Sequence, residues 1–335
     1  MNSTVSLRDR LDYEPVPLKF GTSGRRGLVA DLSQLEVYLN ALAELEYLQS
    51  LPPAAGGIVR GDEFFFACDL RPSSLVEVDC GKVRGALAPA VARAIADAGM
   101  RPAWLGRIPT PALANHALRR GRGCIMVTGS HIPFDRNGYK TNSAAGELLK
   151  RDEAPIQARV ESVRARLYAQ PAGDSPFAPS GPRAGMFKES GRPLPPEDAA
   201  AGEAYLRRYT DFFPGQPLRE GGSWSTSTPP SAATCSPNSS GGSGPKSSPP
   251  AGAVFVPIDT RPSTTTSRVI AALAREAWNA RGPVDAVVST DGDSDRPLLG
   301  VEPATGADAP CRSASSVATW WAWSAGRSAP TPRGA

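Results

Sequence analysis

Short apolar runs and helical patterns alternate along the first half of the chain. Apolar side chains recur every three to four positions in four segments, which are predicted to be helices: 28–49, 85–100, 111–120 and 155–168. Compact apolar runs, which are typical of buried strands, fill three further segments: 63–69, 102–108 and 123–130. Because strands and helices alternate, we predict an α/β fold whose first domain, residues 1–155, contains a mixed, mainly parallel sheet.

The second half of the chain continues this pattern with interruptions. Residues 170–198 are rich in proline, glycine and serine and are predicted to be loop. A helical pattern returns at 201–213, and the run DAVVST at 285–290 predicts a strand that leads into an acidic loop. A length of 335 residues accommodates two domains. We therefore predict a second α/β domain over residues 156–302.

Two segments do not fit a second domain of this kind. Residues 221–253 carry one charge, Lys246, and the tail at 311–335 places three tryptophans within four positions. Moving the reading frame back by one base would give apolar residues at 223–225, along one helical face from 235 to 243, and at 247–248. We hypothesise that both segments are translated out of frame, the alternative being a natural flexible linker with a disordered tail. Coil is expected at 221–253 and disorder over 303–335, which leaves the second domain incomplete.

Composition excludes several classes of function. The net charge is +4 without a block of lysine and arginine, so nucleic acid is not an expected partner. No apolar run approaches the roughly 20 residues that span a bilayer, and the N-terminus lacks the apolar stretch of a secretory signal. Five widely spaced cysteines predict reduced thiols and a cytoplasmic location. Oligomeric state is not indicated.

The segment KFGTSGRRG, residues 19–27, is the first of three candidate sites. Its backbone N–H groups, the hydroxyls of Thr22 and Ser23, and the guanidinium of Arg26 are suited to a phosphate or a sugar phosphate. A GTSG sequence also forms ordinary flexible turns. Phosphate binding and a simple turn therefore both stay open for this segment alone.

The segment TGSHIPFDRNGYK, residues 128–140, directly follows a predicted strand. Ser130 becomes a nucleophile only when a base or a metal activates it, and His131 and Lys140 are placed to supply proton transfer and positive charge. The alternative is a polar loop in which Ser130 caps a helix. His116 lies within a helical pattern and is expected to be a partly buried or surface residue rather than a ligand.

The segment DGDSDR, residues 291–296, places Asp291, Asp293 and Asp295 in one short loop. Three carboxylates so close together repel each other unless a cation neutralises them, and oxygen ligands of this kind suit Mg²⁺. Arg296 is suited to holding an anionic substrate. A calcium-binding loop is less consistent with the spacing, and a solvated acidic turn is the remaining alternative.

Together and in this order, the three motifs resemble those of the α-D-phosphohexomutases, the phosphomannomutase and phosphoglucomutase enzymes. The resemblance covers about residues 17–300 and implies two α/β domains of that family, without its third and fourth domains. It implies that Ser130 is a phosphoserine that exchanges its phosphoryl group with a hexose phosphate through a hexose 1,6-bisphosphate. One departure is Gly129, where the family more often has alanine.

The resemblance also assigns roles to the candidate residues. It implies a Mg²⁺ site formed by Ser130, Asp291, Asp293 and Asp295. Arg26, His131 and Lys140 would then assist catalysis, and the substrate would be bound by Thr22, Ser23, Arg26 and Arg296. The preference among mannose, glucose and glucosamine phosphates stays open.

Truncation is expected to impair full mutase turnover. Two other functions remain as alternatives at this stage. One is a catalytically inactive remnant that binds sugar phosphate or Mg²⁺. The other is a Mg²⁺-dependent phosphatase that uses the same serine and aspartates.

Overall fold

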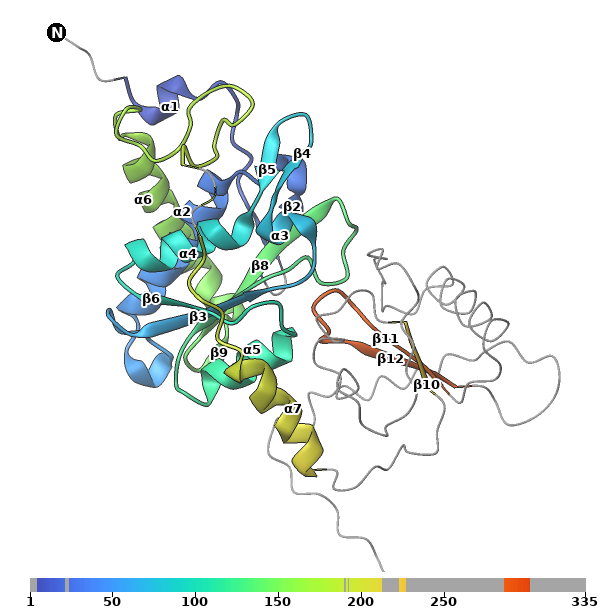
Figure 1. Ribbon diagram of the computed structural model, residues 1–335. Coiled ribbons are helices and arrows are strands. Elements are labelled where there is room, and N and C mark those ends of the chain that lie inside the picture. The colour runs from blue at the N-terminus through green and yellow to red at the C-terminus, as the bar shows by residue number, and fades with distance from the viewer. Residues whose placement is uncertain are drawn as a thin grey trace, which may run out of the picture.

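A computed structural model (Figure 1) describes residues 5–21, 24–189, 191, 193–212, 223–226 and 286–301 of the chain. The first domain is built on a seven-stranded sheet in the order β1-β2-β8-β7-β3-β6, with β9 paired to β8. Its strands are β1 (Phe20–Gly21), β2 (Gly24–Leu28), β3 (Glu63–Cys68), β6 (Arg101–Trp104), β7 (Cys124–Val127), β8 (Arg136–Ser143) and β9 (Gly146–Glu147). The predicted α/β fold with a mixed sheet is confirmed.

Parallel pairing is concentrated at β3, which has β6 on one side and β7 on the other. The strands beyond β7 pair antiparallel, because β8 follows β7 through a short loop rather than through a crossover helix. Five of the six side chains of β3 are buried, which explains its continuous apolar sequence. The predicted strands at 63–69, 102–108 and 123–130 correspond to β3, β6 and β7.

Helices cover both faces of this sheet (Figure 1). On one face α2 (Gln34–Ser50), α4 (Leu87–Asp97) and α6 (Glu153–Tyr168) pack with Phe64 and Phe66 of β3. On the other face α5 (Thr110–Leu118) and the start of α7 (Ala200–Phe212) pack with Phe65 and Ala67. The alternation of β3 side chains between the two cores follows from the two-residue period of a strand. The domain is thus a three-layer α/β/α structure.

Local signals set the ends of these helices. Ser33 caps α2, since its Oγ accepts a hydrogen bond from the backbone N–H of Glu36 at 3.3 Å.

Shorter elements complete the first domain: α1 (Leu7–Arg10), α3 (Pro72–Leu75), the β4–β5 hairpin (Glu77–Asp79 and Val83–Gly85), and three single 3₁₀ turns at Val29–Asp31, Pro53–Ala55 and Lys150–Asp152.

The expected boundary at residue 155 lies inside α6. This helix buries Ile156, Val160 and Val163 against the first core, and the segment after it adds Phe177 to the same core. Residues 170–189 form the turns that the sequence predicts, apart from isolated bridges to neighbouring segments. We therefore propose that the first domain extends to about residue 189.

A separate three-stranded sheet has the order β10-β11-β12, formed by β10 (Ser223–Thr226), β11 (Ala286–Thr290) and β12 (Pro297–Val301). The predicted strand at 285–290 corresponds to β11. The prediction of coil across 221–253 is wrong at 223–226, because β10 pairs in parallel with β11. Backbone groups make the hydrogen bonds of such a ladder, so a serine- and threonine-rich segment can join it. The remainder of 221–253 and the tail at 303–335 lie outside the described residues.

Among the helices that the structure describes, none combines the length and apolar character needed to cross a bilayer.

Candidate active site

The candidate site forms where three strands end. β3 is followed directly by Asp69 and the parallel strand β7 by Thr128, so both residues lie at the same edge of the sheet. The loop between β11 and β12 meets this edge (Figure 1), where the backbone N–H of Thr110 donates to the carbonyl of Asp293 at 2.9 Å. Two motifs that are about 160 residues apart in the sequence therefore form one site.

Ser130 and Asp291 are in direct contact. The Ser130 hydroxyl donates a hydrogen bond to Oδ2 of Asp291 at 3.0 Å, and it lies 3.4 Å from Nδ1 of His131. Ser130 is 1% exposed and has a positive φ of 51°, a backbone conformation that is uncommon for residues with a side chain. The residues directly after Ser130 form a turn that leads into β8 rather than a helix, so the alternative of a helix cap does not hold. The serine instead presents its hydroxyl to the acidic loop.

The three aspartates converge on a small volume. One carboxylate oxygen from each of Asp291, Asp293 and Asp295 lies within 4.8 Å of the others. The ammonium group of Lys140, on β8, lies 3.1 Å from Oδ2 of Asp293 and 3.0 Å from Oδ2 of Asp295. Lys140 therefore places a positive charge beside two carboxylates of the acidic cluster.

Two arginines and His131 complete the charged surroundings. Nε of Arg296 lies 3.5 Å from Asp295, its Nη1 lies 4.0 Å from Asp291, and Nη1 also contacts Nδ1 of His131. Arg26 belongs to β2, and its Nη2 is buried without a hydrogen-bond partner in the described structure. Burial and the neighbouring charge of Arg296 lower the pKa of Arg26, whereas the aspartates oppose this shift. An unpaired guanidinium nitrogen in such a place is suited to an anionic ligand.

Burial and mutual repulsion change the ionisation of the aspartates. Burial raises the pKa of Asp291 to about 8, and the charges of Asp293 and Asp295 act in the same direction. Burial opposes ionisation of Asp293 as well, but Lys140 and a hydrogen bond from Thr110 lower its pKa overall. Burial also opposes the charge of Lys140, and the two facing aspartates raise its pKa. Without a bound cation, one carboxyl group of the cluster, that of Asp291, therefore holds a proton near neutral pH.

The cluster fits a divalent cation. Oδ1 of Asp293 and Oδ1 of Asp295 are buried and make no hydrogen bond in the described structure, although Oδ1 of Asp295 lies near Arg296. Buried carboxylate oxygens without donors are costly unless a cation or a water satisfies them. Three carboxylates are also the hard oxygen ligands that Mg²⁺ prefers. The donor set and its unsatisfied oxygens thus agree with the metal site expected from the sequence.

Cation binding is expected to release a proton from Asp291. Since its pKa in the folded, metal-free protein lies near 8, the carboxyl is protonated below about pH 8, whereas an ordinary aspartate is already ionised above about pH 4. A cation binds the ionised form, so affinity should rise with pH up to about 8 and then level off. Titration calorimetry with Mg²⁺ in buffers of different ionisation enthalpy should show release of up to about one proton near pH 7 and almost none above pH 9. Equal proton release at both pH values would contradict the shifted pKa.

Several residues that hold the site were not identified from the sequence. Asp69 accepts hydrogen bonds from the Thr128 hydroxyl at 2.8 Å and the Gly129 N–H at 3.3 Å, and the Thr128 hydroxyl accepts one from the Ser130 N–H at 2.7 Å. Thr110 donates its hydroxyl to Oδ2 of Asp293 at 2.7 Å. The position of Asp69 at the end of a buried strand was the one sequence signal available for it.

The remaining candidate residues have separate outcomes. Thr22 and Ser23 lie outside the described residues, so their predicted role in substrate binding is not tested. His116 is buried and packs edge-on against Phe65, with ring centroids 4.8 Å apart, as a structural residue would. Burial lowers its pKa, and Arg120 adds to the shift. His116 was expected to be a partly buried or surface residue rather than a ligand, and the structure places it in the core instead of at the surface.

The α/β/α domain thus presents a buried serine hydroxyl beside a carboxylate cluster with cationic side chains around it. Residues 79–166 match the family model described as phosphoglucomutase/phosphomannomutase, alpha/beta/alpha domain I. The chain belongs to the phosphoglucomutase/phosphomannomutase family. The resemblance noted from the three sequence motifs is confirmed.

Curated relatives match most of the length of this chain. The chain is 33% identical over 292 residues to a phosphomannomutase of Sinorhizobium fredii, a match that covers 86% of this chain and 53% of the relative. It is 31% identical over 299 residues to a phosphomannomutase of Salmonella muenchen, covering 85% and 50%. The chain thus spans about half the length of these relatives.

A solved structure supports the fold. A family protein from Burkholderia thailandensis, described as phosphoglucomutase/phosphomannomutase, superposes with a TM-score of 0.52 at 18% identity, covering 84% of this chain and 54% of that one. At this identity the likeness concerns the fold alone.

Proposed function

We propose that the chain acts as a phosphohexomutase of the phosphomannomutase and phosphoglucomutase type, with Ser130 as the carrier of the phosphoryl group. The observation that carries this proposal is the 3.0 Å contact between the Ser130 hydroxyl and Asp291, which joins the serine loop to the carboxylate cluster. A serine hydroxyl is a poor nucleophile unless a neighbouring base or metal activates it, and in this proposal the carboxylate cluster supplies that activation.

In the proposed reaction Ser130 is first loaded from a hexose 1,6-bisphosphate. The bond between phosphorus and the sugar oxygen breaks, a bond between phosphorus and Oγ forms, and the serine proton ends on the sugar oxygen. In the return step the phosphoserine gives its phosphoryl group to a hydroxyl of a hexose monophosphate, and Oγ regains a proton. The bisphosphate formed in this step then reorients and returns its other phosphoryl group to Ser130, which completes the exchange between the 1- and 6-positions.

The residues around Ser130 have separate tasks in this scheme. His131, 3.4 Å from Oγ, is placed to carry the proton between serine and sugar. Lys140, Arg26 and Arg296 offset the negative charge of the phosphoryl group. Asp291, Asp293 and Asp295 would hold Mg²⁺ together with the phosphoserine. When bound, this ion would neutralise charge on the transferred group.

The test is an assay with hexose 1-phosphate, a catalytic amount of hexose 1,6-bisphosphate and Mg²⁺, in which three products are followed. A mutase is expected to phosphorylate Ser130 and to form hexose 6-phosphate. Phosphorylation of Ser130 with slow sugar conversion would agree with the impairment expected from the sequence. Release of inorganic phosphate without sugar isomerisation would favour the phosphatase, and no phosphorylation of folded protein would favour a binding module.

A further inference from the structure

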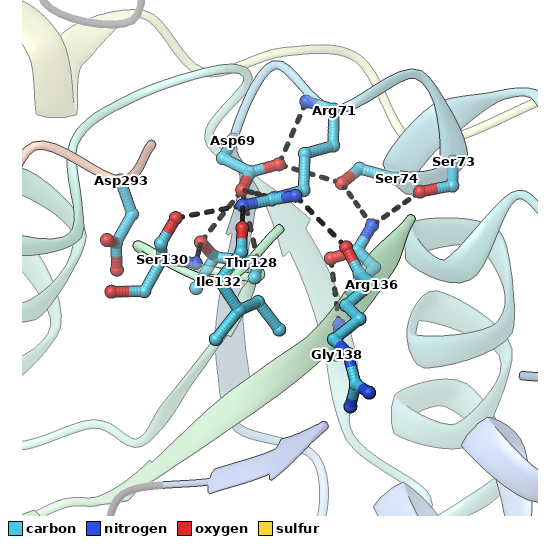
Figure 2. A network of polar contacts seen from close by, with 12 residues as sticks. Asp69, Arg71, Ser73, Ser74, Thr128, Ser130, Ile132, Arg136, Gly138 and Asp293 are labelled. Atoms are coloured by element: carbon cyan, nitrogen blue, oxygen red, sulfur yellow. Dashed lines mark hydrogen bonds and ion pairs between the residues drawn. The ribbon is translucent and has the colours of Figure 1, made fainter. Parts of the chain in front are cut away.

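Arg71 is buried against the loop that carries Ser130, although its sequence context DLRPS resembles an ordinary turn. The side chain is 1% exposed, and its guanidinium group lies across residues 130–136 (Figure 2). It donates hydrogen bonds to four carbonyl oxygens of this loop, those of Ser130 at 2.9 Å, Ile132 at 2.6 Å, Pro133 at 2.9 Å and Arg136 at 3.0 Å. One side chain thus binds three carbonyls of the turn between β7 and β8 and a fourth at the start of β8.

Asp69 binds the same loop through an N–H group and a hydroxyl, so Asp69 and Arg71 together form a clamp on residues 128–136. Oδ2 of Asp69 lies 3.3 Å from Nε of Arg71 and also accepts from the Thr128 hydroxyl and the Gly129 N–H, while its Oδ1 accepts from the Ser74 hydroxyl at 2.9 Å. The two charges neutralise each other in a fully buried place, where neither would be stable alone. The N–H side of the loop is therefore bound through Asp69, and the carbonyl side through Arg71.

The backbone of the loop is shaped to this clamp. A Cβ atom at Gly129 would lie 2.5 Å from Nε and 2.6 Å from Cζ of Arg71, so the missing side chain allows the guanidinium to pack directly on the peptide. The family more often has alanine at position 129, but in this structure an alanine side chain there would collide with Arg71. Ser130, with its φ of 51°, holds an uncommon conformation that persists only where the surroundings fix it. Its N–H binds Thr128 and its carbonyl binds Arg71.

We propose that Arg71 is a positioning residue for phosphoryl transfer. Its guanidinium fixes the backbone of 130–136 and so directs Oγ of Ser130 toward the carboxylate cluster. The inference rests on the proposed function, because positioning matters only if Ser130 exchanges a phosphoryl group. Arg71 itself acts through the loop and not through contact with the sugar.

Arg84 offers a matched control for this proposal. It is also a buried arginine, and it donates to three backbone carbonyls, those of Ala30 at 3.0 Å, Val83 at 2.7 Å and Ala184 at 3.2 Å. Arg71→Lys and Arg84→Lys therefore each remove a buried guanidinium that binds backbone, and they keep the positive charge. They differ in the backbone that loses its hydrogen-bond donors, which is the loop of residues 130–136 for Arg71→Lys and segments outside that loop for Arg84→Lys.

Two measurements on the full chain test the proposal. Hydrogen exchange of peptides that cover residues 128–138 should be at least about tenfold faster in Arg71→Lys than in Arg84→Lys. The maximal rate of Ser130 phosphorylation by hexose 1,6-bisphosphate should fall roughly a hundredfold in Arg71→Lys and less than about twofold in Arg84→Lys. The bisphosphate concentration that gives half the maximal rate should be unchanged, because Arg71 does not touch the sugar. The double variant Asp69→Asn/Arg71→Gln, which leaves no unpaired charge, provides the same comparison if Arg71→Lys does not fold.

The outcomes separate this proposal from the proposed function. Loop exchange or phosphorylation rates that match those of Arg84→Lys would overturn the positioning role, and so would a raised half-saturating concentration at an unchanged maximal rate. If the unmodified chain is not phosphorylated at Ser130, the proposed function fails. The positioning claim then fails with it as a statement about catalysis, while the exchange data still show whether Arg71 orders the loop.

Discussion

Replacing Ser130 with alanine will reduce phosphoryl incorporation from hexose 1,6-bisphosphate by at least about a thousandfold, because the variant lacks the atom that receives the group. The fold should persist, since the hydroxyl makes its direct hydrogen bond to the acidic loop and not to the core. Intact-protein mass spectrometry after incubation with the bisphosphate and Mg²⁺ measures the incorporation, and peptide mapping locates it.

A second buried serine serves as the control for this prediction. Ser175 is 1% exposed, and its Oγ accepts a hydrogen bond from the N–H of Phe177 at 3.3 Å. Ser175→Ala should take up phosphoryl groups at the rate of the unmodified chain. Incorporation that survives in Ser130→Ala at more than a few per cent would place the acceptor elsewhere and remove Ser130 from the mechanism.

Replacing Asp293 with asparagine will weaken binding of a divalent cation by about a hundredfold, equivalent to about 3 kcal/mol. Asp293 is fully buried and accepts hydrogen bonds from Thr110 and Lys140, so the change removes a ligand charge without adding volume. Lys140 then faces one fewer carboxylate, and the loop between β11 and β12 is held less firmly. Titration calorimetry with Mg²⁺ at about pH 8 measures the effect.

An exposed aspartate provides the comparison for the metal prediction. Asp198 lies before α7, where its Oδ1 accepts from the N–H of Ala200 at 2.9 Å. Asp198→Asn should bind Mg²⁺ as the unmodified chain does. Unchanged affinity in Asp293→Asn would mean that the cation binds at a different place on the molecule.

The sequence predicts well those features that depend on neighbours along the chain. The apolar run at 63–69 and the helical pattern at 28–49 are local signals. The first forms β3 as expected, and the second forms α2, which begins at Gln34 because residues 24–28 belong to β2 and 29–31 to a 3₁₀ turn. The serine and the aspartates were identified because each follows directly on an apolar strand. The prediction that they meet in one site depended on the family resemblance, since spacing alone does not show that residues 130 and 291 lie close together.

Features that depend on distant partners were missed. Arg71 is followed by proline in a turn-like sequence, and its four carbonyl partners lie about 60 residues away. Coil was expected at 223–226 because Ser, Trp and Thr form no apolar pattern there, yet pairing with β11 supplies the backbone hydrogen bonds. The hypothesis of two out-of-frame segments remains a prediction, and the coding DNA across codons 221–335 tests it.

In the proposed mechanism the esterified serine and the three aspartates surround one divalent cation. ³¹P NMR of the chain phosphorylated at Ser130 tests it directly, with Mn²⁺ replacing Mg²⁺ as a paramagnetic probe. We expect one equivalent of bound Mn²⁺ to broaden the phosphoserine resonance beyond detection in the unmodified chain, and Asp293→Asn to restore most of it. A sharp phosphoserine resonance at saturating Mn²⁺ would show that the cation binds away from the phosphoserine.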